Sequence, residues 1–573
     1  MRMALLVALA VAGACDDSLP GPYDQLPLDG DFVVGVGSPV HVVRDRYGVA
    51  HIDASTVGDA AFVQGYVMAH DRLPQMDILR RFGAGTLSEL FGALDPGVID
   101  TDLEMRMHRM RPLAQQAWDA LQASDRTDDR EVAQLLQRFA DGVNAYAAAI
   151  VPDRAPAAYA WNATTAPDLA APFFVLPGDG SAEWLAEPLS PRYIPHAIDP
   201  AAGVLVTANA DPVGATFDND PLNQAKADGS PLYVGITYAA GVRHQRIAEM
   251  IAARGGVTLE DMMAVQHDTT STMGARLTPR LRTLLAYLDA PAGAPADAAA
   301  YLAALSPEDR ARLIAARDLL AGWTFATPTG LLAGDAQGDA AATSLFNTWM
   351  HMFIERTLTD ELAAIDFDVW RLDDNALARI VVGVLLAPTE LVASADTGEP
   401  IVCDALATAG PDDSCSKAAL QALLDAMAHL ASPAGFGTTD VMTWAWGEKH
   451  RLKIQPLFPN TALDLPGPGL PGFPRRGDNF VVNRADAGWD DLDFSQSADG
   501  PAQRFIAIAD PGAFDAGTPL RVTWALPGGV IYDSRSPHYR DLLDDYYLPE
   551  KQFDAPYLTA EIVRDAESRW RFR

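Results

Sequence analysis

Apolar residues recur at helical spacing through much of the chain. Residues 59–82 give the clearest case, because their apolar side chains are three and four positions apart and share one helix face: Phe62, Tyr66, Ala69, Leu73, Met76 and Leu79. Gly83 and Gly85 mark the end of this helix. The same pattern predicts further helices over residues 113–121, 129–149, 242–253, 259–265, 276–288, 307–321, 341–362, 416–430 and 560–570.

Short β-rich runs lie between and after these helices. Residues 32–36 and 40–43 flank Gly37-Ser-Pro39 and predict a hairpin-like start, followed by a turn at 44–48 and a strand at 49–52. Further short strands are predicted at residues 203–207, 480–483, 504–508 and 520–524. The Ala- and Pro-rich residues 290–300 carry no such pattern and indicate an exposed linker.

Both patterns are lost between residues 151 and 172. This stretch is rich in Ala and Pro and shows no sustained period. It predicts an irregular junction between a helical part, residues 31–150, and a longer part, residues 173–573.

The charge balance narrows the possible partners. The 573 residues contain 43 Lys and Arg against 76 Asp and Glu, a formal net charge of −33, and 49% of them are hydrophobic. Such a chain can bury a large core, so disorder is excluded as a description of the whole. The acidic balance argues against nucleic acid and against anionic membranes, because a phosphate backbone is bound by clustered Lys and Arg.

The first fifteen residues have the features of an export signal. Arg2 precedes an apolar run over residues 4–14 that is too short to span a bilayer, and the run ends at Cys15. The residues before Cys15 also resemble a bacterial lipobox, so the cysteine is either a lipid attachment site or a chance residue after an ordinary signal peptide. Residues 16–30 then predict a flexible tether. We expect an exported protein of the bacterial cell envelope, anchored by lipid.

Two cysteines remain, Cys403 and Cys415. Export permits a disulfide, and the intervening Gly410-Pro-Asp-Asp413 favours a turn that brings them together. We predict a disulfide that staples a surface loop. No paired Cys-x-x-Cys element is present, so the sequence predicts no zinc site.

Several motifs in order along the chain resemble the penicillin acylase family. In the first part they match its small chain: 42–54 (VVRDRYGVAHIDA), 64–72 (QGYVMAHDR), 75–77 (QMD), 80–81 (RR), 85–92 (GTLSELFG) and 139–146 (FADGVNAY). In the second part they match its large chain: 176–180 (LPGDG), 183–184 (EW), 199–200 (DP), 203–209 (GVLVTAN), 243–247 (RHQRI), 266–268 (QHD), 446–450 (WGEKH), 477–483 (GDNFVVN), 500–504 (GPAQR) and 536–541 (SPHYRD).

The resemblance implies an α+β fold with the four-layer αββα core of the N-terminal nucleophile hydrolases and a large helical shell. Members are made as one precursor that cuts itself into two chains. They hydrolyse linear amide bonds in β-lactam antibiotics, acyl-homoserine lactones and similar acylated amines. The new N-terminal serine attacks the carbonyl, its own α-amine acts as base, and backbone and asparagine donors stabilise the oxyanion. No cofactor or metal is implied.

The sequence departs from the family between Tyr146 and Leu176. There the family carries its linker, nucleophile strand, oxyanion asparagine and much of its central sheet, whereas this chain has only the irregular junction. No serine occurs in residues 151–180. Thr164 and Thr165 are the available hydroxyls, but Pro167 would interrupt the strand that a nucleophile must begin. We therefore expect an incomplete central sheet and assign no nucleophile.

Other candidate groups have structural interpretations. Ser181 follows Gly180 in a segment that resembles a family loop. Three pairs are better explained by packing or surface contacts than by metal binding, because adjacent residues seldom converge on one ion: His51 with Asp53, His70 with Asp71, and His267 with Asp268. An ion-pair network is predicted around one helix and its exit from Asp71, Arg72, Arg80, Arg81 and Glu89. No Gly-x-Ser-x-Gly motif occurs.

Two functions follow from the sequence. One is a hydrolase of small acylated amines. The other is a catalytically silent remnant or split-gene half that acts as a binding or structural module, with a partner chain supplying the missing core.

Overall fold

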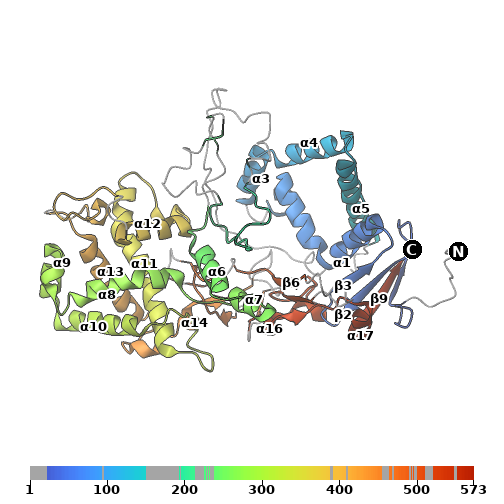
Figure 1. Ribbon diagram of the computed structural model, residues 1–573. Helices are drawn as coiled ribbons and strands as arrows, with labels where there is room; N and C mark the ends of the chain where they lie inside the picture. Colours follow the sequence, from blue (N-terminus) through green and yellow to red (C-terminus); the bar gives the residue numbers. More distant parts are fainter. Residues whose placement is uncertain are drawn as a thin grey trace, which may run out of the picture. The chain divides into compact units, whose positions relative to one another are not determined.

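The computed structural model describes residues 22–92, 96–149, 193, 195–212, 225–227, 229, 232, 238–386, 391–407, 411–454, 464–467, 470–488, 492, 494–495, 500–509, 521–547 and 551–573. The chain divides into two compact units. Unit 1 comprises Met1–Ala170 and Ala507–Arg573, and unit 2 comprises Ala171–Ile506. Figure 1 shows the elements of both units coloured along the sequence.

A four-stranded sheet in unit 1 joins the two ends of the described chain. Its order is β1 (Gly30–Phe32), β9 (Ala566–Phe572), β2 (Val40–Asp45) and β3 (Ala50–Asp53). β2 is antiparallel to both neighbours, with Val42 opposite Ile52 on one side and Trp570 on the other. β1 runs parallel to β9. The last strand of the chain therefore lies inside the sheet rather than at its edge.

This sheet corrects two sequence predictions. The hairpin is formed by β2 and β3, and β1 pairs with β9 instead of β2. The predicted helix over residues 560–570 is also wrong, because α17 (Thr559–Arg564) ends early and β9 follows. Phe572 belongs to the core cluster that includes Tyr66 and Trp570 packs against it, whereas Arg571 between them pairs with Asp31. This two-residue alternation is a strand pattern, set by neighbours over 500 residues away.

The helices of unit 1 begin with α1 (Val57–Ala84), which confirms the clearest sequence prediction. Thr56 caps its start, and Gly85 ends it with a φ of 63°. α5 (Thr127–Ala149) packs closely against α1 through Gly65 and Gly142, where an added Cβ would lie 2.1 and 1.8 Å from facing backbone oxygens. The remaining helices are α2 (Ser88–Phe91), α3 (Val98–Met107), α4 (Met110–Ala123) and α16 (Leu543–Tyr547).

A three-stranded sheet has the order β6 (Arg504–Ile508), β7 (Arg521–Ala525) and β8 (Phe553–Asp554). Both longer strands were predicted. Trp524 and Phe553 pack in a small cluster with Leu542. Within the described ranges the sheets have two to four strands, so the four-layer core remains a prediction.

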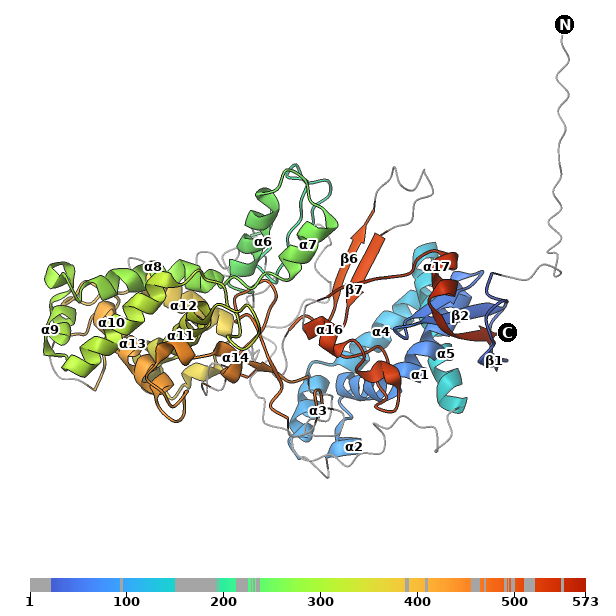
Figure 2. The ribbon, with the colours of Figure 1, turned by 90° about the horizontal axis from the view of Figure 1, so that it is seen from below.

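Unit 2 is a helical bundle around α11 (Gln337–Ala363) (Figure 2). Leu345, Phe346, Trp349 and Phe353 of this helix are fully buried in the largest apolar core. The surrounding helices are α6 (Val242–Ala252), α7 (Leu259–Gln266), α8 (Thr272–Ala286), α9 (Ala296–Ala304), α10 (Pro307–Gly322), α12 (Asp374–Leu386), α13 (Cys415–Ala431) and α14 (Trp446–Lys449), with a short sheet of β4 (Arg451–Leu452) and β5 (Phe473–Pro474). Overall the described chain is α+β and mostly helical.

Three predictions in unit 2 are wrong. Residues 290–300 are not a linker, because α9 starts after Pro295 and buries Ala298 and Leu302. A run of alanines shows little hydrophobic contrast, which hides its helical period. Residues 203–207 and 480–483 do not form strands, and α12 was not predicted.

Cys403 and Cys415 are joined by a disulfide, with Cα atoms 4.9 Å apart. Both cysteines are about 2% exposed and pack in the main core, and Cys415 is the first residue of α13. The bridge closes the loop between the two cysteines, where Leu406, Ala407 and Pro411 are exposed, and it also fixes the start of a core helix.

Candidate functional site

The large-chain-like motifs of unit 2 contact one another. Asn209 accepts a hydrogen bond from Arg243, and the carboxylate of Asp268 accepts two from Arg246. The backbone N–H of Asn483 donates to the carbonyl oxygen of Asp268. Two further motifs contact the 477–483 motif. The indole N–H of Trp446 donates a hydrogen bond to the carbonyl oxygen of Gly477, and the guanidinium of Arg504 donates one to Oδ1 of Asn483. Motifs spread over about 300 positions thus converge in one unit, which makes this group the candidate site.

Asn209 has an unusual backbone conformation. Its φ of 58° places it in the left-handed region, which asparagine adopts more readily than most residues with a Cβ but still uncommonly. The Asn209 carbonyl accepts from the N–H of Ala239 at 2.8 Å, and Ala210 forms a parallel bridge with Ala239. The surrounding segment therefore holds this conformation.

Arg243 fixes which end of the Asn209 carboxamide faces outward. Its Nη2 lies 2.9 Å from Oδ1 of Asn209. Because a guanidinium only donates, it must face the amide oxygen, which leaves the NH2 group on the opposite side. Among the described residues no group accepts from this NH2, and Asn209 is exposed. The arrangement leaves the NH2 group of Asn209 available to donate a hydrogen bond to a ligand oxygen.

Arg243 is itself in a crowded positive environment. Burial, followed by the positive charge of Arg484, lowers the pKa of Arg243 from its ordinary value, and Asp486 acts in the opposite sense. An arginine stays protonated under these conditions. The positive charge on Arg243 polarises the Asn209 amide and makes its N–H groups better donors to a developing negative charge.

A half-buried carboxyl, that of Asp374, lies at the start of α12 and contacts the loop over residues 477–487. Asp374 accepts a 2.7 Å hydrogen bond from Asn479, whose carboxamide also bonds the backbone N–H and carbonyl of Ala487. Burial, reinforced by the negative charge of Asp486, raises the pKa of Asp374 to about 6. This contact ties α12 to the GDNFVVN motif.

The motifs of unit 1 form a separate polar contact inside its core. Arg44 of β2 makes a two-pronged ion pair with Asp71 of α1, and both side chains are less than 10% exposed. Arg44 also donates to the carbonyl of Gly48 and lies over the ring of Trp570. His70 contacts Asp71 at 2.8 Å. This group connects strand to helix and is structural.

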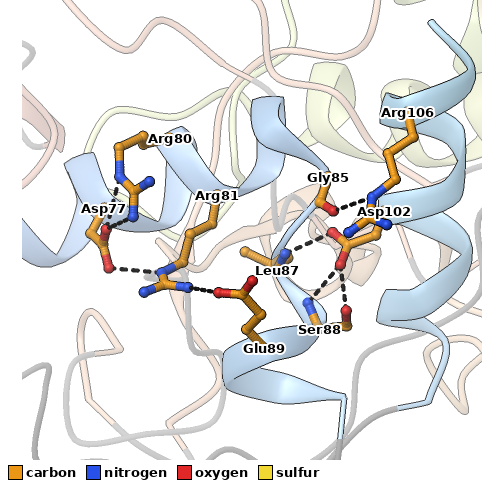
Figure 3. Close-up of polar contacts among 9 residues, drawn as sticks. All are labelled: Asp77, Arg80, Arg81, Gly85, Leu87, Ser88, Glu89, Asp102 and Arg106. Carbon is orange, nitrogen blue, oxygen red and sulfur yellow. Dashed lines mark hydrogen bonds and ion pairs between the residues drawn. The ribbon is translucent and has the colours of Figure 1, made fainter. Parts of the chain in front are cut away.

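The ion-pair network near the exit of α1 is smaller than predicted (Figure 3). Arg80 and Arg81 both pair with Asp77, and Arg81 also reaches Glu89. Asp71 and Arg72 are not part of it. Arg72 donates to the carbonyls of Gly529 and Val530, because its non-helical φ of −141° kinks α1 two residues before Pro74 and redirects the side chain.

A second contact in Figure 3 holds the turn after α1. Asp102 of α3 accepts from the backbone N–H groups of Leu87 and Ser88, and Arg106 donates to the Gly85 carbonyl. Burial acts to raise the pKa of Asp102, but the hydrogen bonds from Ser88 and Leu87 outweigh it and lower the pKa. The Asp102 carboxylate is the N-terminal anchor for α2.

The other residues singled out by sequence fall into two groups. Cys15, Thr164, Thr165 and Ser181 lie outside the described residues. Of the histidine pairs, His70 and Asp71 contact each other. His51 contacts Asp45 instead of Asp53, and Asp268 pairs with Arg246.

Within the described ranges, no group of three or more His, Cys, Asp or Glu side chains is arranged to hold a metal ion. Among the same residues, no helix has both the length and the apolar character needed to cross a membrane.

Comparison with known proteins decides the family. The model of the penicillin amidase family matches residues 39–167 and 150–563, which is most of the chain. The chain belongs to the penicillin amidase family. The two matched parts of this family member overlap at residues 150–167, inside the junction inferred from the loss of periodicity.

Matches between this penicillin amidase family protein and curated relatives are partial. It is 35% identical to the penicillin acylase 2 proenzyme of Pseudomonas sp. (strain SE83) over 127 residues, which are 22% of this chain and 15% of that protein. It is 36% identical to the acyl-homoserine lactone acylase QuiP of Pseudomonas syringae pv. syringae over 143 residues, 24% of this chain and 16% of that one. Penicillin G acylase of Escherichia coli is 34% identical over 110 residues, 19% of this chain and 12% of that protein. The matched parts thus cover less than a fifth of these relatives.

The Asn209–Arg243 contact is a feature of the candidate site that sequence reasoning missed. Both residues lie in motifs that resemble the family, but the oxyanion asparagine was expected in the missing block. The available signal was an asparagine, a residue that tolerates positive φ, in a motif followed 34 positions later by an arginine. Only the tertiary contact shows that the two side chains act together.

Proposed function

We propose that this chain binds acylated amines through the N–H groups of Asn209, and that it represents the oxyanion-holding side of an amide hydrolase site. The observation that carries the proposal is the Asn209 carboxamide, held by Arg243 with its NH2 group free of partners among the described residues. Such a donor suits a carbonyl oxygen that gains negative charge when the amide is attacked. The names of the curated relatives, penicillin acylase and acyl-homoserine lactone acylase, support acylated amines as the ligand class.

We also propose that this chain alone does not catalyse amide hydrolysis. Residues 151–180 contain no serine, and the two family matches meet at residues 150–167, which supports a missing block between Tyr146 and Leu176. Without a nucleophile and its α-amine, neither self-cleavage nor acyl transfer has a starting group. Removal of a catalytic nucleophile costs about six orders of magnitude in well-studied hydrolases.

The first prediction concerns the purified mature protein. We expect intact-mass spectrometry to find one uncut chain, and a panel of a penicillin, an acyl-homoserine lactone and a phenylacetyl anilide to show no hydrolysis above the background rate. Two fragments, one starting with a new serine or threonine, would show that a nucleophile is present and would restore the hydrolase function in full.

A second candidate function is that of one half of a two-chain hydrolase whose partner chain supplies the nucleophile. The two-part family match favours it, since both sides of the interval are retained. Sequencing of the locus distinguishes the two: a coding block for a nucleophile strand beside this gene supports a partner, and its absence supports a binding module.

We also propose that the protein is exported and anchored by lipid at Cys15, which follows the apolar run after Arg2. Several acyl chains are needed for stable anchoring, as one chain binds a membrane only marginally. Cys15→Ala is expected to move the protein from the membrane fraction to the soluble fraction. Retention of the variant in the membrane fraction would rule out lipidation at this position.

A further inference from the structure

A short segment, residues 238–240, is linked to both residues of the Asn209–Arg243 contact. The N–H of Ala239 donates to the Asn209 carbonyl, which holds the backbone of Asn209. The same segment continues into Gly241, whose φ of 80° turns the chain into α6, and Arg243 lies in the first turn of that helix. A shift of this segment would therefore move the asparagine and the arginine together.

Helix α12 holds this segment from its other side. Nη1 of Arg379 donates to the carbonyl oxygen of Tyr238 at 2.7 Å, and Oδ1 of Asn375 accepts from the N–H of Ala240 at 3.2 Å. Arg379 and Asn375 are four positions apart and so lie on one face of α12. Among the described residues no carboxylate pairs with Arg379, and its guanidinium donates to the backbone carbonyl of Tyr238.

α12 is a firm support for these two side chains. Leu377, Ala378 and Val381 are about 1% exposed or less and anchor the helix in the main core. Its first residue, Asp374, is bound by Asn479 of the GDNFVVN motif. The contacts run without a gap from that loop to α12, from α12 to residues 238–240, and from there to Asn209.

We propose that Arg379 and Asn375 are positioning residues that set the direction of the Asn209 carboxamide by holding residues 238–240. Only the expected effect on ligand binding rests on the proposed function. The orientation of the Asn209 carboxamide is set in the unliganded protein and can be measured without a ligand. Neither residue is expected to touch the ligand.

The test reads the Asn209 carboxamide directly. In the full-length protein labelled with ¹⁵N-asparagine, the side-chain NH2 signals of Asn209 are identified by their loss in Asn209→Ala. We expect Arg379→Ala to shift these signals and to weaken binding of a benzylphosphonamidate, a tetrahedral anion that mimics the attacked amide, about tenfold. Arg379→Lys should restore both in large part, because the Tyr238 carbonyl needs one donor. The exposed Arg371, just before α12, gives the control Arg371→Ala, which should change neither.

The outcomes separate the two proposals. Unchanged Asn209 signals in Arg379→Ala would overturn the positioning role, whatever the affinity. Shifted signals combined with equal binding by wild type and Asn209→Ala would support the positioning role and overturn the proposed function. If Arg379→Ala does not fold, Asn375→Ala removes the acceptor for Ala240 on the same segment and is held to the same criteria.

Discussion

Replacement of Gly142 by leucine is expected to unfold unit 1 at temperatures where the wild type is folded. Gly142 of α5 faces α1, and even a Cβ at this position would lie 1.8 Å from the carbonyl oxygen of Phe62 and 2.9 Å from the backbone nitrogen of Tyr66. These are backbone atoms that no rotamer change can move, so the two helices would have to separate. We expect a loss of at least about 3 kcal/mol in the free energy of unfolding, at or beyond the upper end for an overpacked core.

Chemical denaturation followed by circular dichroism measures this loss. Gly83→Leu is the matched control, since Gly83 also lies in a helix of unit 1 but a Cβ there would meet nothing within 4 Å. The free energy of unfolding of Gly83→Leu should stay within about 1 kcal/mol of the wild-type value, because leucine fits there without a clash and has a higher helix propensity than glycine. Equal stability of the Gly142→Leu protein would mean that α1 and α5 do not cross at this distance.

Arg44→Met should also destabilise the protein strongly, by about 3–5 kcal/mol. The substitution keeps much of the apolar volume but removes the charge that faces Asp71 inside the core, where both side chains are almost fully buried. Asp71 would keep its contact with His70 but lose the guanidinium, so much of the cost of removing its carboxylate from water would no longer be compensated. Loss of the contacts to the Gly48 carbonyl and the Trp570 ring adds to the effect.

A double-mutant cycle identifies the cause of this effect. If the loss of the guanidinium beside Asp71 is responsible, Arg44→Met combined with Asp71→Asn should be more stable than Arg44→Met alone. Full additivity of the two substitutions in unfolding experiments would contradict an ion pair between them and would leave packing against Trp570 as the explanation.

Sequence patterns predicted the long helices well and the short elements poorly. α1, α8, α10, α11 and α13 all contribute buried apolar side chains to a core, which a periodicity of three and four residues predicts. β9 was mistaken for the end of a helix, because a seven-residue run can satisfy either period, and its partners β1 and β2 lie at the other end of the chain. α9 was missed because its alanines give little contrast between buried and exposed faces.

The candidate site was predictable as a set of motifs but not as a geometry. The sequence indicated that residues 203–209, 243–247 and 477–483 belong to one family pattern, and the structure brings these segments together. The positive φ of Asn209, its contact with Arg243 and the hydrogen bond from Ala239 are tertiary features that no local sequence pattern predicts. The absence of a serine in residues 151–180, in contrast, is fully visible in the sequence.

Titration of the benzylphosphonamidate into the wild type and into Asn209→Ala tests the central claim most directly. A hydrogen bond to a charged group contributes about 1.5–3 kcal/mol, so loss of the Asn209 donor should weaken binding by about tenfold or more. Asn144→Ala, which removes an exposed carboxamide on α5, should leave the affinity unchanged. Equal affinities of the wild type and Asn209→Ala would contradict the claim that Asn209, oriented by Arg243, holds the oxyanion.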